Sequence, residues 1–160
     1  VENFSLVNAG SLDVCIFGST KRTINYRNGI HVWIKSSDYE NYHLMILLSF
    51  IIQGHPSWRK SNISVFDICK KGEETKIRSE LEELIRAGRL PITTKNIQVI
   101  SQKPERDSRE IINQYSATAG LTIIGFHSEL IRHQGLKIFQ GYNELENILF
   151  VNSHSRKAID

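Results

Sequence analysis

The sequence lacks a hydrophobic run long enough to cross a lipid bilayer. Its longest apolar stretch, residues 44–52, has nine of the 160 residues, whereas a membrane-spanning helix needs about 20. No secretory signal opens the chain, which begins at Val1 rather than at a methionine. That start is consistent with a piece of a longer polypeptide. We therefore expect this segment not to span a membrane itself, and attachment to a membrane part outside it stays open.

Cysteine is scarce, and the excess of positive charge is small. The two cysteines, Cys15 and Cys69, lie in apolar strand-like runs, and their spacing fits no zinc motif. We expect both to be small buried thiols in a reducing compartment. The net charge of +3 comes from 20 basic and 17 acidic residues. It is too mild to indicate a nucleic-acid partner, and no basic stripe with interleaved aromatic residues occurs.

Motifs for catalysis and cofactor binding are missing as well. The chain has no Gly-x-x-x-x-Gly-Lys-Ser/Thr, Gly-x-Gly-x-x-Gly or Gly-x-Ser-x-Gly sequence. Among the six histidines, His127 and His133 are six residues apart without a third metal ligand in the pattern. We expect no catalytic residue, no metal, no cofactor and no enzyme activity. The adjacent pairs His127–Ser128 and Ser153–His154 leave a small hydrolase or transferase as an alternative.

What the chain does contain is a regular alternation of apolar strands and helical segments. Strands are predicted at residues 30–34, 63–68, 97–100, 121–125 and 148–151. Helices are predicted at 38–53, 73–87 and 108–119, with a weaker helical region at 128–146 that is broken by Gly135 and Gly141. Strands separated by helices pair in parallel, and continuously apolar strands suit a sheet covered on both faces. The sequence therefore predicts an α/β three-layer sandwich with a mainly parallel sheet of about five strands.

The chain divides into an α/β lobe at 29–155, an N-terminal extension or inter-lobe segment at 1–28, and a tail at 156–160. The extension holds a loosely alternating run, 12–17, which we expect to add a strand at the sheet edge. The helix ending near residue 53 is apolar nearly all round, which predicts the most buried helix. Ser108 is the predicted cap of the helix that follows it, and Trp33 is predicted to pack in the core.

Two small groups of residues are candidates for binding. In open α/β sheets, ligands bind at the carboxyl ends of the strands, where the first predicted strand is followed by Lys35, Ser36 and Ser37. Such residues near a helix start can hold an anion, although ordinary loop composition would produce the same set. The second group is Trp58-Arg59-Lys60. Trp58 either packs over the end of the apolar helix or contacts a partner.

These segments also carry a resemblance to a known family. The run His31-Val32-Trp33-Ile34, an aliphatic helix, and Trp58-Arg59-Lys60 before Ile63-Ser64-Val65-Phe66 resemble the cytosolic C-terminal domain of cation–chloride cotransporters of the Na-K-Cl type, in a prokaryotic form. Residues 119–125 resemble a later strand of that domain, with Gly120 where the family usually has an aspartate. The resemblance covers about residues 29–152.

The resemblance implies a non-catalytic regulatory and dimerisation domain at the cytoplasmic face of the cell membrane, part of an integral membrane protein. Its implied partners are the transmembrane domain of the same polypeptide and a second copy of the domain, forming a homodimer. This chain would supply one lobe of the regulatory domain.

The implied fold is similar to that of universal stress proteins and is also described as flavodoxin-like. Some universal stress proteins bind ATP with an aspartate after the first strand and a Gly-x-x-Gly, nine residues, Gly-Ser/Thr pattern after the fourth. Here Lys35 replaces the aspartate, and Gly125 is followed by Ser128 and then by Ile138-Phe139 at the matching positions. Bulky residues prevent the close backbone approach that glycine allows. We therefore expect no nucleotide, and a stand-alone nucleotide-binding protein of the universal-stress type remains the alternative.

Overall fold

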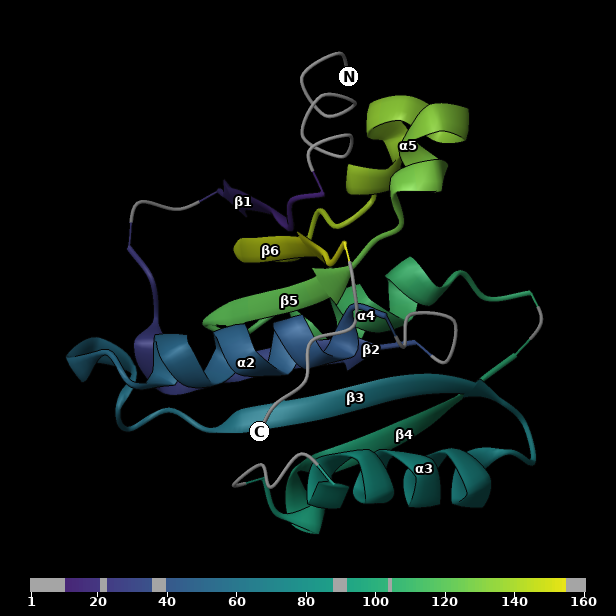
Figure 1. Cartoon of the computed structure of the whole chain (residues 1–160), viewed down its shortest axis with the longest axis horizontal. Helices are drawn as coiled ribbons and strands as arrows, with labels where there is room; N and C mark the ends of the chain where they lie inside the picture. Colours follow the sequence, from purple (N-terminus) through teal and green to yellow (C-terminus); the bar gives the residue numbers. More distant parts are fainter. Residues whose placement is uncertain (1–10, 21–22, 36–39, 88–91, 104, 155–160) are drawn as a thin grey trace.

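The computed structural model describes residues 11–20, 23–35, 40–87, 92–103 and 105–154. Its strands are β1 (Val14–Ser19), β2 (Ile30–Ile34), β3 (Ile63–Lys70), β4 (Ile97–Gln102), β5 (Leu121–Gly125) and β6 (Asn147–Asn152) (Figure 1). Its α-helices are α2 (Tyr42–Gln53), α3 (Glu74–Ala87), α4 (Ser108–Ser116) and α5 (Ser128–Gln134). Short 3₁₀ turns lie at Tyr26–Asn28, Pro56–Trp58, Thr94–Asn96 and Gly135–Phe139.

The strands form one six-stranded sheet in the order β1-β6-β5-β2-β3-β4. Strands β2 to β6 pair in parallel, and β1 pairs antiparallel with β6. The predicted parallel strands and the added edge strand are confirmed. Along the chain, the parallel strands have the spatial order 5-4-1-2-3, which is the 3-2-1-4-5 order of a doubly wound dinucleotide-binding sheet and differs from the 2-1-3-4-5 order of flavodoxin.

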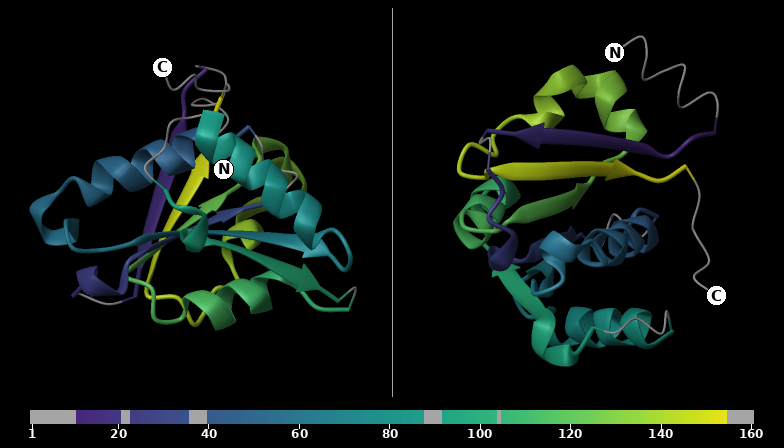
Figure 2. Two further views of the ribbon diagram at one scale, coloured as in Figure 1. Left: turned by 90° about the horizontal axis from the view of Figure 1, so that it is seen from below. Right: turned by 90° about the vertical axis from the view of Figure 1, so that its left-hand side faces the viewer.

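Helices cover both faces of the sheet, which confirms the three-layer sandwich. On one face, α2 and α3 pack against Val32, Val65 and Ile123 in one core. On the other, α4, α5 and the turn Gly135–Phe139 pack against a second core that includes Trp33 and Phe66 (Figure 2). Alternate side chains of each strand thus enter different cores, which is why the strands read as continuous apolar runs.

The weaker helical region at 128–146 is broken at Gly135 and Gly141, as predicted. It holds α5 and the turn Gly135–Phe139, and the two glycines have positive φ angles of 57° and 88°. One helix prediction needed correction. Helix α4 ends at Ser116, and its cap is Asp107 rather than Ser108, because the Asp107 carboxylate accepts the N–H of Arg109 at 2.9 Å.

Helix α2 is most continuously buried over its first half. Its residues from Tyr42 to Ile46 are buried, whereas Leu47 and Ile51 are 37% and 62% exposed. The prediction that this is the most buried helix is confirmed, because six of its twelve residues are buried, against three of fourteen in α3. Its apolar surface is nevertheless not covered on all sides. No helix in the described ranges is both long and apolar enough to span a bilayer.

The two cysteines lie in different environments. Cys69 is buried on β3, as predicted. Cys15 is exposed, so its predicted burial is wrong: it lies on the edge strand β1 and points to the same face as its partner Val151. Helices α2 and α3 on this face pack over other strands.

Candidate functional site

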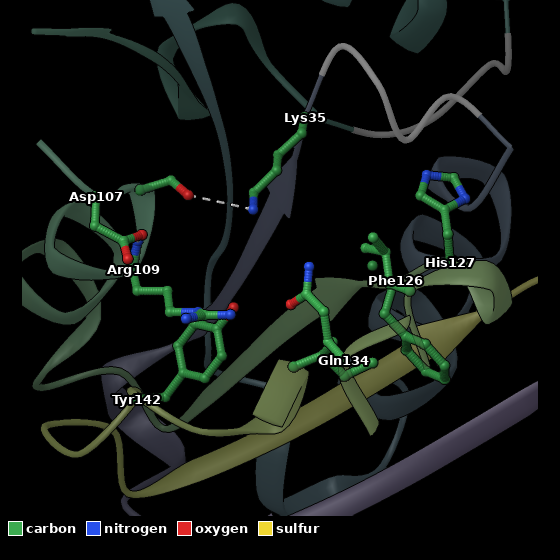
Figure 3. A pocket seen from close by; sticks show the side chains of 11 residues that line it. Lys35, Asp107, Arg109, Phe126, His127, Gln134 and Tyr142 are labelled. Atoms are coloured by element: carbon green, nitrogen blue, oxygen red, sulfur yellow. Dashed lines mark hydrogen bonds between the residues drawn. The ribbon is translucent and has the colours of Figure 1, made fainter. Parts of the chain in front are cut away.

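A cavity of about 290 Å³ lies at the carboxyl ends of β2 and β5 (Figure 3). These two neighbouring strands lie where the strand order reverses, because the chain passes from β2 to β3 on one side and later returns to β5 on the other. Ligands of doubly wound sheets bind in this crevice. We therefore treat this cavity, called the switch-point cavity below, as the candidate site.

Two cationic side chains from distant segments line the switch-point cavity. Lys35 follows β2, and its Nζ donates to the Oγ of Ser108 at 3.4 Å. Arg109 lies in the first turn of α4, with its guanidinium carbon 6.0 Å from the centroid of the Tyr142 ring. Within the described part of the chain, neither side chain forms a salt bridge. Both are half-buried, so they face a partly desolvated space with little charge compensation.

The Arg109 side chain packs against the loop that contains Gly141 and Tyr142. A Cβ atom added to Gly141 would lie 3.0 Å from Cδ of Arg109, so the arginine stem occupies space that only glycine leaves free. The Gly141 carbonyl accepts a hydrogen bond from Nδ2 of Asn113 at 2.8 Å. This bond ties the loop to α4, the helix on which Arg109 lies. The Arg109 side chain thus lies between the Gly141 backbone and the Tyr142 ring.

One carboxylate also lines the cavity. Asp107 is occupied as the cap of α4, where its Oδ1 accepts the N–H of Arg109. A capping carboxylate is stabilised by the helix dipole. His127 and Gln134 add polar groups at the other side of the same cavity. The cavity lining therefore carries two positive charges and one negative charge, and the negative group already accepts a backbone hydrogen bond.

A buried polar network closes the strand ends beside the cavity. Asn41, which is 0% exposed, donates from Nδ2 to the Phe126 carbonyl at 3.0 Å and accepts the N–H of Ser153 at 2.7 Å. Asn152 donates to the same carbonyl at 2.9 Å. A Cβ on Gly125 would lie 3.2 Å from Nδ2 of Asn41, so this glycine permits close packing of the segment before α2. Sequence reasoning missed this network, whose only signal is an asparagine ahead of an apolar helix.

The segment compared with a nucleotide-binding loop is folded into the core here. Ser128 is the first residue of α5, and Ile138 is 7% exposed. The Phe139 ring packs edge-on against Phe126 and Phe150, with centroids 5.2 Å and 4.9 Å away. Ile138 and Phe139 therefore act as hydrophobic anchors for the chain that borders the cavity.

The two groups of binding residues that were proposed from the sequence lie in different parts of the structure. Lys35 lies in the switch-point cavity, whereas Ser36 and Ser37 fall outside the described residues. Trp58-Arg59-Lys60 precedes β3, at the amino end of the parallel strands and thus opposite the cavity. The two candidate groups are not brought together. Sequence reasoning did not include Arg109, Gln134 or Tyr142 in the site.

Trp58 packs inside the protein. It is 6% exposed, and its ring meets that of Tyr26 edge-on at 5.0 Å. A Cβ on Gly120 would lie 3.1 Å from Cζ3 of Trp58 and 2.5 Å from the carbonyl oxygen of Asn25, so this position admits no side chain. Of the two roles considered for Trp58, packing is the one observed. Its neighbours Arg59 and Lys60 are exposed.

Trp33 packs in the core, as predicted, and is part of a polar contact. Its ring stacks on Phe66 with centroids 4.6 Å apart, and the side chain is 1% exposed. Its Nε1 donates to Ser116 Oγ, which also contacts Nδ1 of His31. Burial lowers the pKa of His31 to about 4. His31 is therefore neutral at pH 7.

Ser153 and His154, one of the two pairs considered for hydrolysis, contact Asp13. Ser153 Oγ lies 3.4 Å from Oδ1 of Asp13, which also accepts the N–H of His154 at 2.9 Å. These contacts bind the end of β6 to the chain ahead of β1. Across the described residues, no three His, Cys, Asp or Glu side chains come together in a way that could hold a metal ion.

No protein-family model matches the sequence, and no curated protein matches it either. Among solved structures, the chain is similar to the crystal structure of the cytoplasmic domain of a prokaryotic cation chloride cotransporter. The match has a TM-score of 0.65 and 18% sequence identity, and it covers 99% of this chain. This chain spans 59% of the length of that domain. At this identity, the similarity establishes a shared fold.

Proposed function

We propose that this chain is a lobe of the non-catalytic, cytosolic regulatory domain of a cation–chloride cotransporter. The observation that carries the proposal is the fold match over 99% of the chain. It is supported by the two sequence segments that carry the resemblance, because both lie next to β3. Strand β2, which contains Trp33, pairs with β3, and the turn that contains Trp58 leads into β3. The partner in this account is a transmembrane domain of the same polypeptide, at the cytoplasmic face of the cell membrane.

The same proposal includes assembly with a second copy of the domain. Strand β1 pairs only with β6, so among the described strands it forms one edge of the sheet. Its residue Phe17 is 56% exposed, and the run Val14–Ser19 carries neither charge nor proline. Natural proteins usually use a charged side chain or a proline to protect an edge strand from association. An edge without them supports self-association through β1.

Transport by the full-length polypeptide tests the regulatory role. The protein that contains this chain is reconstituted into liposomes, and ⁸⁶Rb⁺ uptake is measured with external chloride and with gluconate in its place. We expect uptake that requires chloride, and a changed rate when the polypeptide is truncated before this chain. Uptake that ignores chloride contradicts the cotransporter assignment. Chloride-dependent uptake at an unchanged rate after truncation contradicts the regulatory role.

The second candidate is a stand-alone nucleotide-binding protein, because the switch-point cavity lies where doubly wound sheets bind nucleotides. Against it, the segment from Ser128 to Phe139 lacks glycines at the positions where a phosphate-binding loop needs them. Calorimetry with ATP and Mg²⁺ separates the two candidates. Micromolar affinity favours the nucleotide-binding protein, and no heat of binding favours the regulatory lobe.

A further inference from the structure

We propose that the switch-point cavity binds a small oxyanion, a phosphate or a carboxylate, between the side chains of Lys35 and Arg109. The proposal concerns a ligand site in the domain itself. It does not rest on the assignment to a transporter, because nothing in the site depends on a membrane part.

Three side chains with donor groups reach the cavity from different elements. Lys35 extends from the end of β2, Arg109 from the first turn of α4, and Gln134 from the end of α5. Figure 3 shows the ends of these three side chains pointing into one space. Lysine and arginine carry donors and no acceptor, and an arginine guanidinium can hold two oxygens of a phosphate or carboxylate at once. The cavity thus offers several donors to one group of oxygens.

The charges in the cavity favour an anion. Lys35 and Arg109 are half-buried, and neither forms a salt bridge with a described residue. Asp107 compensates only in part, because it is exposed and supplies one negative charge against two positive charges. Two like charges in a partly desolvated space repel each other more strongly than in water. An oxyanion between them relieves that repulsion and gains charge-assisted hydrogen bonds.

The site around Arg109 is built in the protein without a ligand. Gly141 leaves room for the arginine stem, and the Tyr142 ring lies beneath the guanidinium. Lys35 is in turn steadied by its bond to Ser108 Oγ. Because the charged groups are placed before binding, less side-chain entropy is lost when an anion binds.

The size of the cavity restricts the ligand. Its volume of about 290 Å³ is at or below the lower end of the roughly 300–1,000 Å³ typical of drug-sized ligand sites. The buried side chain of Ile138 lines it from the Gly135–Phe139 turn. A single phosphate, a small phosphate ester or a short carboxylate fits this space, and a nucleoside triphosphate exceeds it.

Nuclear magnetic resonance titration of the 160-residue chain tests the proposal. Sodium phosphate and sodium succinate are added in separate arms at constant ionic strength, and ATP in a third. We expect saturable shifts of the backbone amides of Lys35, Ser108 and Arg109 in at least one of the first two arms, with a Kd of about 1–10 mM. The arm with the lower Kd identifies the phosphate or the carboxylate as the preferred group.

Substitutions assign the shifts to the two cations. Lys35→Met and Arg109→Met should each weaken binding at least about tenfold, because each removes a charge-assisted contact. Lys76→Met removes an exposed lysine on α3 and should leave binding unchanged. The conservative variants Lys35→Arg and Arg109→Lys keep the charge and should retain binding. They take the place of a methionine variant that fails to fold.

Three outcomes overturn the proposal. The first is the absence of saturable shifts with both phosphate and succinate. The second is an equal response of the wild type and the folded Lys35→Met, Arg109→Met double variant. The third is tighter binding of ATP than of phosphate, which contradicts the size limit.

Discussion

Trp33 Nε1 donates a hydrogen bond to Ser116 Oγ at 2.8 Å, although the two residues lie on different elements, β2 and α4. Ser116 is the last residue of α4 and is 1% exposed. Its Oγ also lies 2.9 Å from Nδ1 of His31. One hydroxyl therefore satisfies the buried indole and joins the helix to the central strand of the sheet.

Replacing this hydroxyl should destabilise the domain. Ser116→Ala leaves the indole N–H of Trp33 buried without its acceptor, which costs about 1–3 kcal/mol of the free energy of unfolding. Urea denaturation followed by tryptophan fluorescence measures the loss. The matched control is Ser57→Ala, at an exposed serine of the Pro56–Trp58 turn. Equal midpoints for both variants would show that the contact contributes nothing.

The buried His31 should make stability depend on pH. Burial lowers its folded-state pKa to about 4, below the unfolded value of about 6.5. The unfolded chain therefore binds more protons between these values, and the free energy of unfolding falls as the pH drops from about 6.5 towards 4. This contribution is fully present above pH 6.5, and about 2–3 kcal/mol of it is lost by pH 4.

His31→Gln removes the titration and keeps a polar side chain. Urea denaturation at pH 7, 6 and 5 should show a steeper loss of stability in the wild type than in this variant. The difference between the slopes of the two proteins cancels contributions from the titrating groups that they share. Parallel slopes would contradict a lowered pKa for His31.

The network around Asn41 should be essential for local order at the cavity. Asn41→Ala removes the acceptor of the Ser153 N–H and one donor to the Phe126 carbonyl, at a cost of about 1–3 kcal/mol. Hydrogen exchange should show faster exchange of the Ser153 amide. The control Asn143→Ala changes an exposed asparagine and should have no effect. Unchanged protection of Ser153 in Asn41→Ala would contradict the role of the network.

Self-association should depend on the edge strand. Sedimentation velocity at high micromolar concentration should show dimers of the wild type, and Phe17→Glu should shift the chain to monomer, because a charge on an edge strand opposes pairing. Leu136→Glu changes a side chain that is 62% exposed in the Gly135–Phe139 turn and should leave the dimer intact. A monomeric wild type, or equal effects of both variants, would contradict assembly through β1.

The parallel sheet was predictable from sequence because its strands are apolar on both sides. Strands 30–34 and 121–125 were predicted with the bounds that the structure shows. The exposure of Cys15 and of Ile51 was not predictable, because an apolar run does not reveal which of its residues lack a covering element. Periodicity reports the order of elements along the chain, whereas exposure depends on how they pack.

The candidate site was predictable only where it follows a strand. The rule on strand ends identified Lys35, but Ser108, the residue that it contacts, lies 73 positions later in the sequence. Arg109 has no local signal, because nothing in the neighbouring sequence distinguishes it from the other arginines of the chain. Its place in the cavity results from Gly141 and Tyr142, which reach it through the packing of a loop. Such convergence requires the tertiary structure.

The central claim is that this chain belongs to a larger membrane-embedded protein. It is tested most directly by cell fractionation and immunoblotting of the native source with an antibody raised against the 160-residue chain. The account predicts a band well above 18.4 kDa in the membrane fraction, which resists carbonate extraction and is released by detergent. A band at 18.4 kDa that stays in the soluble fraction would contradict the account and favour the stand-alone protein.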